Sequence, residues 1–121
     1  MIEVTTLTGY PNQIHNLLLE NRETADFRLY FYARQYSWYY DITYKDITIK
    51  GSKVVLTPNS LRQFKNILPF GLAFYSDSFV EPFKLDDFVS GRIKMAILNK
   101  DEVQEIESEI YKRWNSIQFS E

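Results

Sequence analysis

The chain offers few side chains that could carry out catalysis. His15 is the single histidine, and there is no cysteine, so a catalytic triad would have one candidate base and a metal site one imidazole. Neither a nucleophile motif nor a metal-type spacing surrounds His15. We therefore interpret it as an ordinary strand or surface residue, and we expect no metal site.

Asp86 and Asp87 are the best candidates for a functional pair of carboxylates, which could transfer protons or hold a divalent cation. Glu81 and Asp77 lie nearby in the sequence. Adjacent residues of an extended chain point to opposite sides, however, so a solvated loop corner is the favoured interpretation. With four glycines, the chain has no phosphate-binding loop. The sequence thus predicts a protein that is not an enzyme and has no cofactor.

Aromatic residues, 17% of the 121-residue chain, are concentrated between residues 27 and 44. Two aromatic runs flank a short polar break there, a pattern typical of a β-hairpin. Because the break lacks an Asn-Gly turn, we expect a connection of about three to five residues around Ala33 to Tyr36.

Both faces of this predicted hairpin are apolar or aromatic. In the first run, Phe27, Leu29 and Phe31 share one face, whereas Arg28, Tyr30 and Tyr32 share the other. A solvated face would carry Thr, Lys or Glu instead, and tyrosine combines a large apolar area with a hydroxyl that tolerates water. We therefore expect a tyrosine face that contacts a partner, made by these residues: Tyr30, Tyr32, Tyr39 and Tyr40.

An alternative use of this face is a stacking platform for single-stranded nucleic acid or a glycan, as in oligonucleotide-binding barrels. The net charge is −2, and no block of Lys and Arg exceeds two adjacent residues. Asp26 and Asp41 also dilute the positive charge of Arg28 and Arg34. Specific nucleic-acid binding is therefore the less favoured hypothesis.

The elements that would position these residues form an antiparallel series. We expect strands over residues 2–8, 13–19, 27–32, 38–44, 47–49, 54–56 and 92–98, with a short helix over 61–64. The turns between residues 13 and 56 recur at the spacing of a small barrel or sandwich. The fold class is therefore mainly β, an antiparallel barrel or sandwich of about five to seven strands with one C-terminal helix.

Residues 66–91 are predicted to form a long aromatic loop, because proline, glycine and serine interrupt the segment too often for a pair of strands. Its exposed aromatic residues would otherwise be an aggregation liability, so we expect the loop to contact a partner. Phe79 and Phe83 are the predicted anchors, with Asp86 and Asp87 at a polar rim.

The C-terminal helix begins near Asn99 or Asp101, where Glu102 or Gln104 completes a capping box. An apolar stripe follows, and it favours a helix that docks on its own sheet: Val103, Ile106, Ile110 and Trp114. We assign one domain, with a β part over residues 1–98 and a helix and tail over 99–121. The N-terminus has no signal-peptide pattern, and the apolar stretch around residues 67–75 is too short to span a membrane.

In their order along the chain, these signals resemble the baseplate plug family of tailed phages. The resemblance covers residues 13–98, although Thr57-Pro58-Asn59 replaces an expected glycine-containing corner and the helix from Asp101 is an extension. The residues that carry it are Phe27 to Tyr32, Ala33-Arg34, Trp38 to Ile42, Gly51, Val55-Leu56, Leu61 to Phe64, Phe70 to Leu72, Leu85 to Phe88 and Gly91 to Ile93.

The resemblance implies a structural virion protein that plugs or lines the axial channel of the baseplate. Its implied partners are other baseplate proteins, namely the hub, the tail tube or tube initiator and the spike, with several copies around the tail axis. It also implies a protein that is assembled in the host cytoplasm and located in the virion, with no membrane and no catalytic role.

Overall fold

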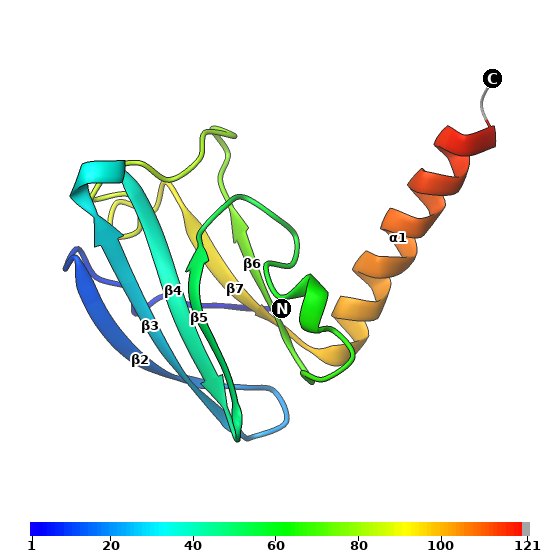
Figure 1. The fold of residues 1–121 in the computed structure, drawn as a ribbon, viewed down its shortest axis with the longest axis horizontal. Helices are drawn as coiled ribbons and strands as arrows, with labels where there is room; N and C mark the ends of the chain where they lie inside the picture. Colours follow the sequence, from blue (N-terminus) through cyan, green and yellow to red (C-terminus); the bar gives the residue numbers. More distant parts are fainter. Residues whose placement is uncertain (120–121) are drawn as a thin grey trace.

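The computed structural model describes the backbone of residues 1–119 and the side chains of residues 1–113. Seven strands form two antiparallel sheets, and a long helix follows them (Figure 1). One sheet has the order β2-β3-β4-β5, with β2 Asn12–Leu18, β3 Thr24–Tyr32, β4 Ser37–Tyr44 and β5 Ile47–Lys53. The other has the order β1-β7-β6, with β1 Ile2–Glu3, β6 Gly71–Tyr75 and β7 Lys94–Leu98.

The remaining elements are two short 3₁₀ helices, η1 (Ala33–Gln35) and η2 (Arg62–Phe64), and the helix α1 (Lys100–Phe119). The predicted mainly β fold with one C-terminal helix is confirmed. Of the two predicted architectures, the structure is a sandwich, because its two sheets stay separate within the described chain. None of the described helices has the length and apolarity that crossing a membrane requires.

The core lies between the two sheets and is strongly aromatic. β3 and β4 alternate buried and more exposed residues over most of their length, as their sequence pattern predicts. Both sheets contribute side chains that are fully enclosed: Phe27, Leu29, Trp38, Tyr40, Leu72, Phe74 and Met95.

The predicted hairpin connection is confirmed. Residues 33–36 join β3 to β4, and Tyr36 ends the connection in the left-handed region with a φ of 47°. The pairing places Leu29 opposite Tyr40 and Tyr30 opposite Tyr39. Adjacent residues of a strand therefore face opposite sides, Tyr40 toward the core and Tyr39 away from it.

Three strands differ from the prediction. β1 covers Ile2–Glu3 rather than residues 2–8, because the chain must then cross from the three-stranded to the four-stranded sheet. β5 continues past the predicted end at residue 49 to Lys53, and the predicted strand over 54–56 is absent. At Gly51 a bulge shifts the register, and the φ of 69° suits glycine. β6 lies inside the segment 66–91, which was predicted to be a loop throughout, and it pairs with β7 outside that segment.

A buried amide fixes the edge of β6. The side-chain oxygen of Asn59 accepts hydrogen bonds from the backbone N–H groups of Leu61 at 3.0 Å and Leu72 at 3.2 Å. A Cβ atom at position 71 would lie 2.6 Å from that oxygen, so glycine is required there. The segment 57–60 thereby covers β6, and Thr57 forms an isolated bridge with Phe74.

Helix α1 is anchored at its N-terminal half. The predicted capping box is present, since Asn99 and Glu102 each accept a hydrogen bond from the other's backbone N–H, at 2.8 and 3.0 Å. Val103 packs on the outer side of β6 and β7, and Glu107 forms an ion pair with Arg62 at 2.7 Å. The helix then extends away from the sheets (Figure 1). The side chain of Trp114, the last member of the predicted stripe, lies outside the described residues.

Candidate interaction surface

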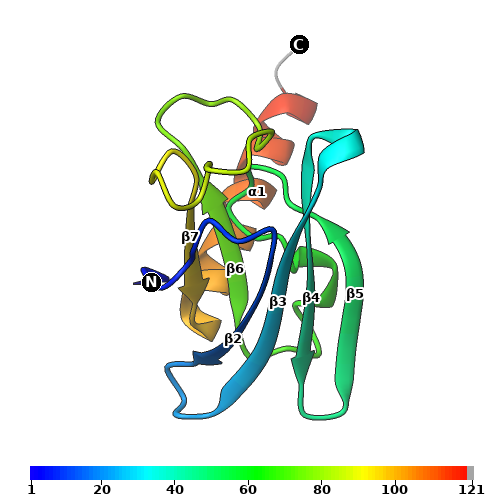
Figure 2. The same cartoon turned by 90° about the vertical axis from the view of Figure 1, so that its left-hand side faces the viewer.

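The segment between β6 and β7, residues 76–93, is called the apical loop here. It lies at the same end of the sandwich as η1, as two views at right angles show (Figures 1 and 2). Phe79 is the most exposed of its apolar side chains, with 88% of its surface accessible. Together the exposed apolar residues of the loop form a set that we call the loop patch: Phe79, Val80, Phe83, Leu85 and Val89.

The apical loop is held by the body of the protein. The buried indole of Trp38 donates a hydrogen bond of 2.9 Å to the carbonyl oxygen of Lys84, and Phe88 packs edge-on against the same indole. The carboxylate of Glu81 accepts a 2.7 Å hydrogen bond from the backbone N–H of Leu56. The loop is therefore attached to the four-stranded sheet and to the segment that follows it.

An ion pair organises the inside of the apical loop. Arg92 donates from Nε to a carboxylate oxygen of Asp87 at 2.7 Å, and its other nitrogens donate to the carbonyl oxygens of Val80 and Glu81. The guanidinium also lies 5.1 Å from the centre of the Phe83 ring. One arginine thus joins both ends of the loop and supports an aromatic ring of the loop patch.

The carboxylate of Asp87 is only 1% exposed, but protein groups donate hydrogen bonds to both of its oxygen atoms. Its second oxygen accepts hydrogen bonds from the backbone N–H groups of Phe83 and Lys84, each at 2.7 Å. Burial alone would raise the pKa of Asp87, but the hydrogen bonds from Arg92 and from these two N–H groups outweigh it. The pKa therefore lies below its usual value, and Asp87 is charged at neutral pH.

Phe79 has a backbone conformation that is unfavourable for its side chain. Its φ is 54°, in the left-handed region that phenylalanine rarely adopts. The ring nevertheless points into solvent, with no core packing that would require the conformation. An exposed aromatic ring therefore stands on a strained backbone position of the apical loop.

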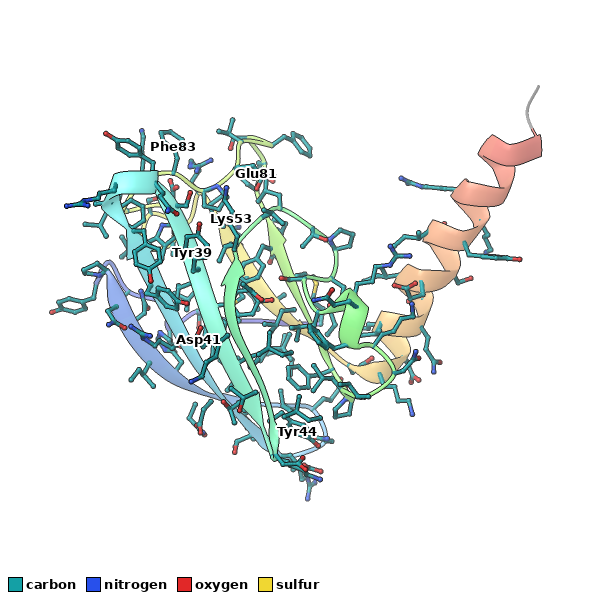
Figure 3. The ribbon with its side chains drawn as sticks, in the orientation of Figure 1. Tyr39, Asp41, Tyr44, Lys53, Glu81 and Phe83 are labelled. Atoms are coloured by element: carbon teal, nitrogen blue, oxygen red, sulfur yellow. The ribbon has the colours of Figure 1, made fainter. Side chains whose placement is uncertain are left out.

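A second candidate surface lies on the outer face of the four-stranded sheet. The rings of Tyr30, Tyr32 and Tyr39, which we call the tyrosine cluster, pack on one another with centroids 5.2 to 6.1 Å apart. Tyr32 is 52% exposed. Figure 3 shows Tyr39 and Asp41 along β4, with Glu81 and Phe83 in the apical loop beyond the end of the strand.

Charged groups flank the tyrosine cluster. The Tyr30 hydroxyl donates a 2.9 Å hydrogen bond to Asp41, and the Arg28 guanidinium lies 4.4 Å from the centre of the Tyr30 ring. Burial and the bond to Asp41 raise the pKa of Tyr30 to about 12, so the hydroxyl remains a donor. Arg28 and Asp41 also form an ion pair at 3.5 Å, which leaves the cluster nearly neutral.

The structure places the predicted contact residues in two groups. Tyr40 and Asp87 are buried within the subunit, so the expectation that they contact a partner is corrected. Tyr40 faces the core because of its strand register, and Asp87 turns inward to bind Arg92. The other predicted contact residues lie outside the main core, and Tyr30 is the least exposed of them at 8%. This group consists of Tyr30, Tyr32, Tyr39, Phe79, Phe83 and Asp86.

Sequence reasoning missed Arg92 and the aliphatic members of the loop patch. Val80, Leu85 and Val89 are separated by charged or polar residues and show no regular period, so aromatic content drew attention to Phe79 and Phe83 instead. The close spacing of Asp87 and Arg92 was the available signal for the ion pair.

His15 is a structural residue in this fold. Its Nε2 lies 2.8 Å from the side-chain oxygen of Gln13, and partial burial lowers its pKa. Over the residues with described side chains, no group of three or more His, Asp or Glu residues is arranged to hold a metal ion.

Comparison with known protein families gives a match to the model described as cyanophage baseplate Pam3 plug gp18, over residues 1–100. A search of curated protein sequences finds no match. The matched range includes both sheets and the apical loop, and it ends where α1 begins. Membership in this family makes the chain a structural protein of a phage tail baseplate that associates with other baseplate components. The chain belongs to the cyanophage baseplate plug family.

Proposed function

We propose that this chain plugs or lines the axial channel of the baseplate, next to the hub and the tail tube, in several copies around the tail axis. The family description names a plug, which supports a position in the channel. The observation that carries the proposal is the loop patch, in which a strained and exposed Phe79 stands on a loop fixed by Asp87 and Arg92.

The loop patch is suited to contact with protein. Exposed apolar area of this kind marks an interaction site when polar groups surround it, and aromatic anchors dominate interface energies. Because Arg92 and Trp38 hold the loop before binding, less conformational entropy is lost on contact. We assign Phe79 and Phe83 as the anchors toward neighbouring hub, tube or tube-initiator, and spike subunits.

The tyrosine cluster supports a second protein contact better than it supports nucleic-acid binding. Its rings pack on one another, and Asp41 neutralises the neighbouring Arg28, so the cluster offers little charge to a phosphate backbone. In the closed plug, aromatic contacts at both surfaces stabilise the state that blocks the channel. Departure of the spike removes a partner that favours this state, which would shift the equilibrium toward opening.

The test is incorporation of variant subunits into tails. The double variant Phe79→Ser and Phe83→Ser should fold with nearly unchanged thermal stability and be lost from purified tails. Tyr111→Ser is the matched control, because it removes an exposed aromatic ring from α1, at 66% exposure, outside the apical loop. Unfolding of the double variant, or its normal incorporation, would show that these rings are not the anchors.

A reconstruction of tails that contain the wild-type chain tests the position. The proposal requires density for the two-sheet body inside the distal channel, in contact with hub and tube subunits. Density at the periphery of the baseplate would refute the axial position and leave the family assignment intact.

A further inference from the structure

The sandwich has four sheet edges, and three of them are blocked against further strand pairing. β1 is two residues long, and the segment 57–60 covers β6. β5 contains the bulge at Gly51 together with Lys50 and Lys53, and bulges and lysines are devices that prevent edge pairing. The fourth edge, β2, has none of these features within its seven residues.

The outer side of β2 carries unpaired backbone groups. β2 pairs with β3 over its whole length without a register shift. The N–H of Phe31 bonds to Pro11 and the N–H of Leu19 to Glu23, so the odd-numbered residues face β3. The N–H and C=O groups of the even-numbered residues point away from β3, and within the described chain they have no backbone partner in another segment: Asn12, Ile14, Asn16 and Leu18.

The side chains of this edge are apolar or neutral. Ile14 and Leu18 are 76% and 64% exposed on the outer face, with Asn16 between them. The strand contains no Asp, Glu, Lys or Arg. His15 faces the other side and is partly buried. An exposed and uncharged edge without a bulge is a template for another strand.

We propose that β2 accepts an extended strand from a neighbouring baseplate protein, which adds one strand to the four-stranded sheet. This inference rests on the proposed function, since it requires neighbours of a different kind in the tail. The backbone of the incoming strand would bond to the even-numbered residues of β2. Its side chains on the outer face would be uncharged and apolar where they meet Ile14 and Leu18.

A second copy of the chain fits this edge less well. Its other three edges are blocked, so it could offer only its own β2, and pairing of two identical edges creates a two-fold axis. The two ends of a phage tail differ, so copies arranged around the tail axis all point the same way along it. A two-fold axis between two copies would make them point in opposite directions. The incoming strand therefore belongs to a different protein, and the purified chain should be monomeric.

Amide hydrogen exchange tests the proposal on the wild-type protein. In the purified chain, the N–H groups of Ile14, Asn16 and Leu18 should exchange rapidly, whereas those of His15 and Leu17, which face β3, should be protected. In purified tails the three outward amides should slow by at least about tenfold. Rapid exchange of these amides in tails that contain the chain would overturn the strand-addition proposal without affecting the proposed function.

Matched lysine variants provide a second test. Ile14→Lys places a charge on the free edge and should be incorporated into tails at least about tenfold less than wild type, a loss of about 1.4 kcal/mol. Thr48→Lys makes the same kind of change on β5 and should be incorporated normally. Thermal unfolding checks that both variants are folded. If Ile14→Lys does not fold, the hydrogen-exchange experiment on the wild-type protein tests the strand-addition proposal instead.

The remaining outcomes are also informative. Normal incorporation of folded Ile14→Lys would overturn the proposal. A concentration-dependent dimer of the purified chain that Ile14→Lys abolishes would assign the edge to a second copy instead and overturn it as well. Absence of the wild-type chain from the distal channel would refute the proposed function, whatever the state of β2.

Discussion

Trp38 and Lys84 are joined by a 2.9 Å hydrogen bond from the indole N–H to a backbone carbonyl oxygen, across 46 residues of sequence. Trp38 is fully buried at the start of β4, whereas Lys84 lies in the apical loop. A core residue of the four-stranded sheet therefore helps to fix the position of the apical loop and of the loop patch on it. Stability of the core and geometry of the interaction surface are coupled through this bond.

Trp38→Phe should release the apical loop while it keeps an aromatic ring in the core. The substitution removes the donor to Lys84 and leaves a small cavity, so we expect a loss of about 2 kcal/mol in the free energy of unfolding. Limited proteolysis should cut between β6 and β7 faster than in wild type. Tyr39→Phe, which removes a solvent-side hydroxyl bond to Gln35, should leave the cleavage rate unchanged.

The ion pair of Asp87 and Arg92 should make stability depend on acid pH. The pKa of Asp87 is lowered in the folded protein, so its contribution is complete above the unfolded-state pKa of about 4. That contribution is lost as the pH falls below this value toward the folded-state pKa. Denaturant unfolding from pH 7 to pH 3 should show this loss for wild type and a shallower slope for Asp87→Asn. Equal slopes would mean that the pair does not govern acid stability.

Asp87→Asn should also destabilise the protein at pH 7. The substitution removes the charge that accepts the hydrogen bonds of the partly exposed Arg92 and of two backbone N–H groups, so we expect a loss of about 2 kcal/mol in the free energy of unfolding. Chemical denaturation measures this difference directly. Asp86→Asn is the control, because the neighbouring carboxylate is exposed and its replacement should change the free energy of unfolding by less than about 0.5 kcal/mol.

Two substitutions of Phe79 separate backbone strain from side-chain contact. Phe79→Gly relieves the positive φ, whereas Phe79→Ala retains it, so the glycine variant should be about 1 kcal/mol more stable than the alanine variant. Thermal unfolding of the purified chains gives this comparison. Both variants lack the ring, so both should be deficient in tail incorporation. A glycine variant that is incorporated normally would show that the ring is not needed.

The parts of the fold that have a regular period could be predicted from the sequence. Alternation along residues 27–32 placed Phe27 and Leu29 on one face, which the structure shows to be the core side, and the capping pattern placed the start of α1. β6 could not be predicted in this way, because four of its five residues are buried and no alternation remains. Pro69 and Gly71, which were interpreted as interruptions of a loop, instead mark its beginning.

The candidate surface was predictable in part for a similar reason. Aromatic residues in an irregular segment drew attention to Phe79, and the structure shows that this ring is exposed. Tyr39 and Tyr40 could not both lie on one face, as the period of a strand requires, and the register with β3 decides which one is buried. The role of Asp87 could not be predicted in the same way, because the fold of the loop brings its partner Arg92 close to it.

The contact between Asn59 and Gly71 has a consequence for how β6 finds its alignment. A strand with buried residues on both faces could slide by one position without exposing a large apolar surface, so hydrophobic pattern alone specifies its register weakly. After such a slide, Phe70 or Leu72 would meet the side chain of Asn59, where a Cβ atom does not fit. One amide and one glycine therefore discriminate between otherwise similar strand alignments, and replacing Gly71 should yield a mixture of registers in β6.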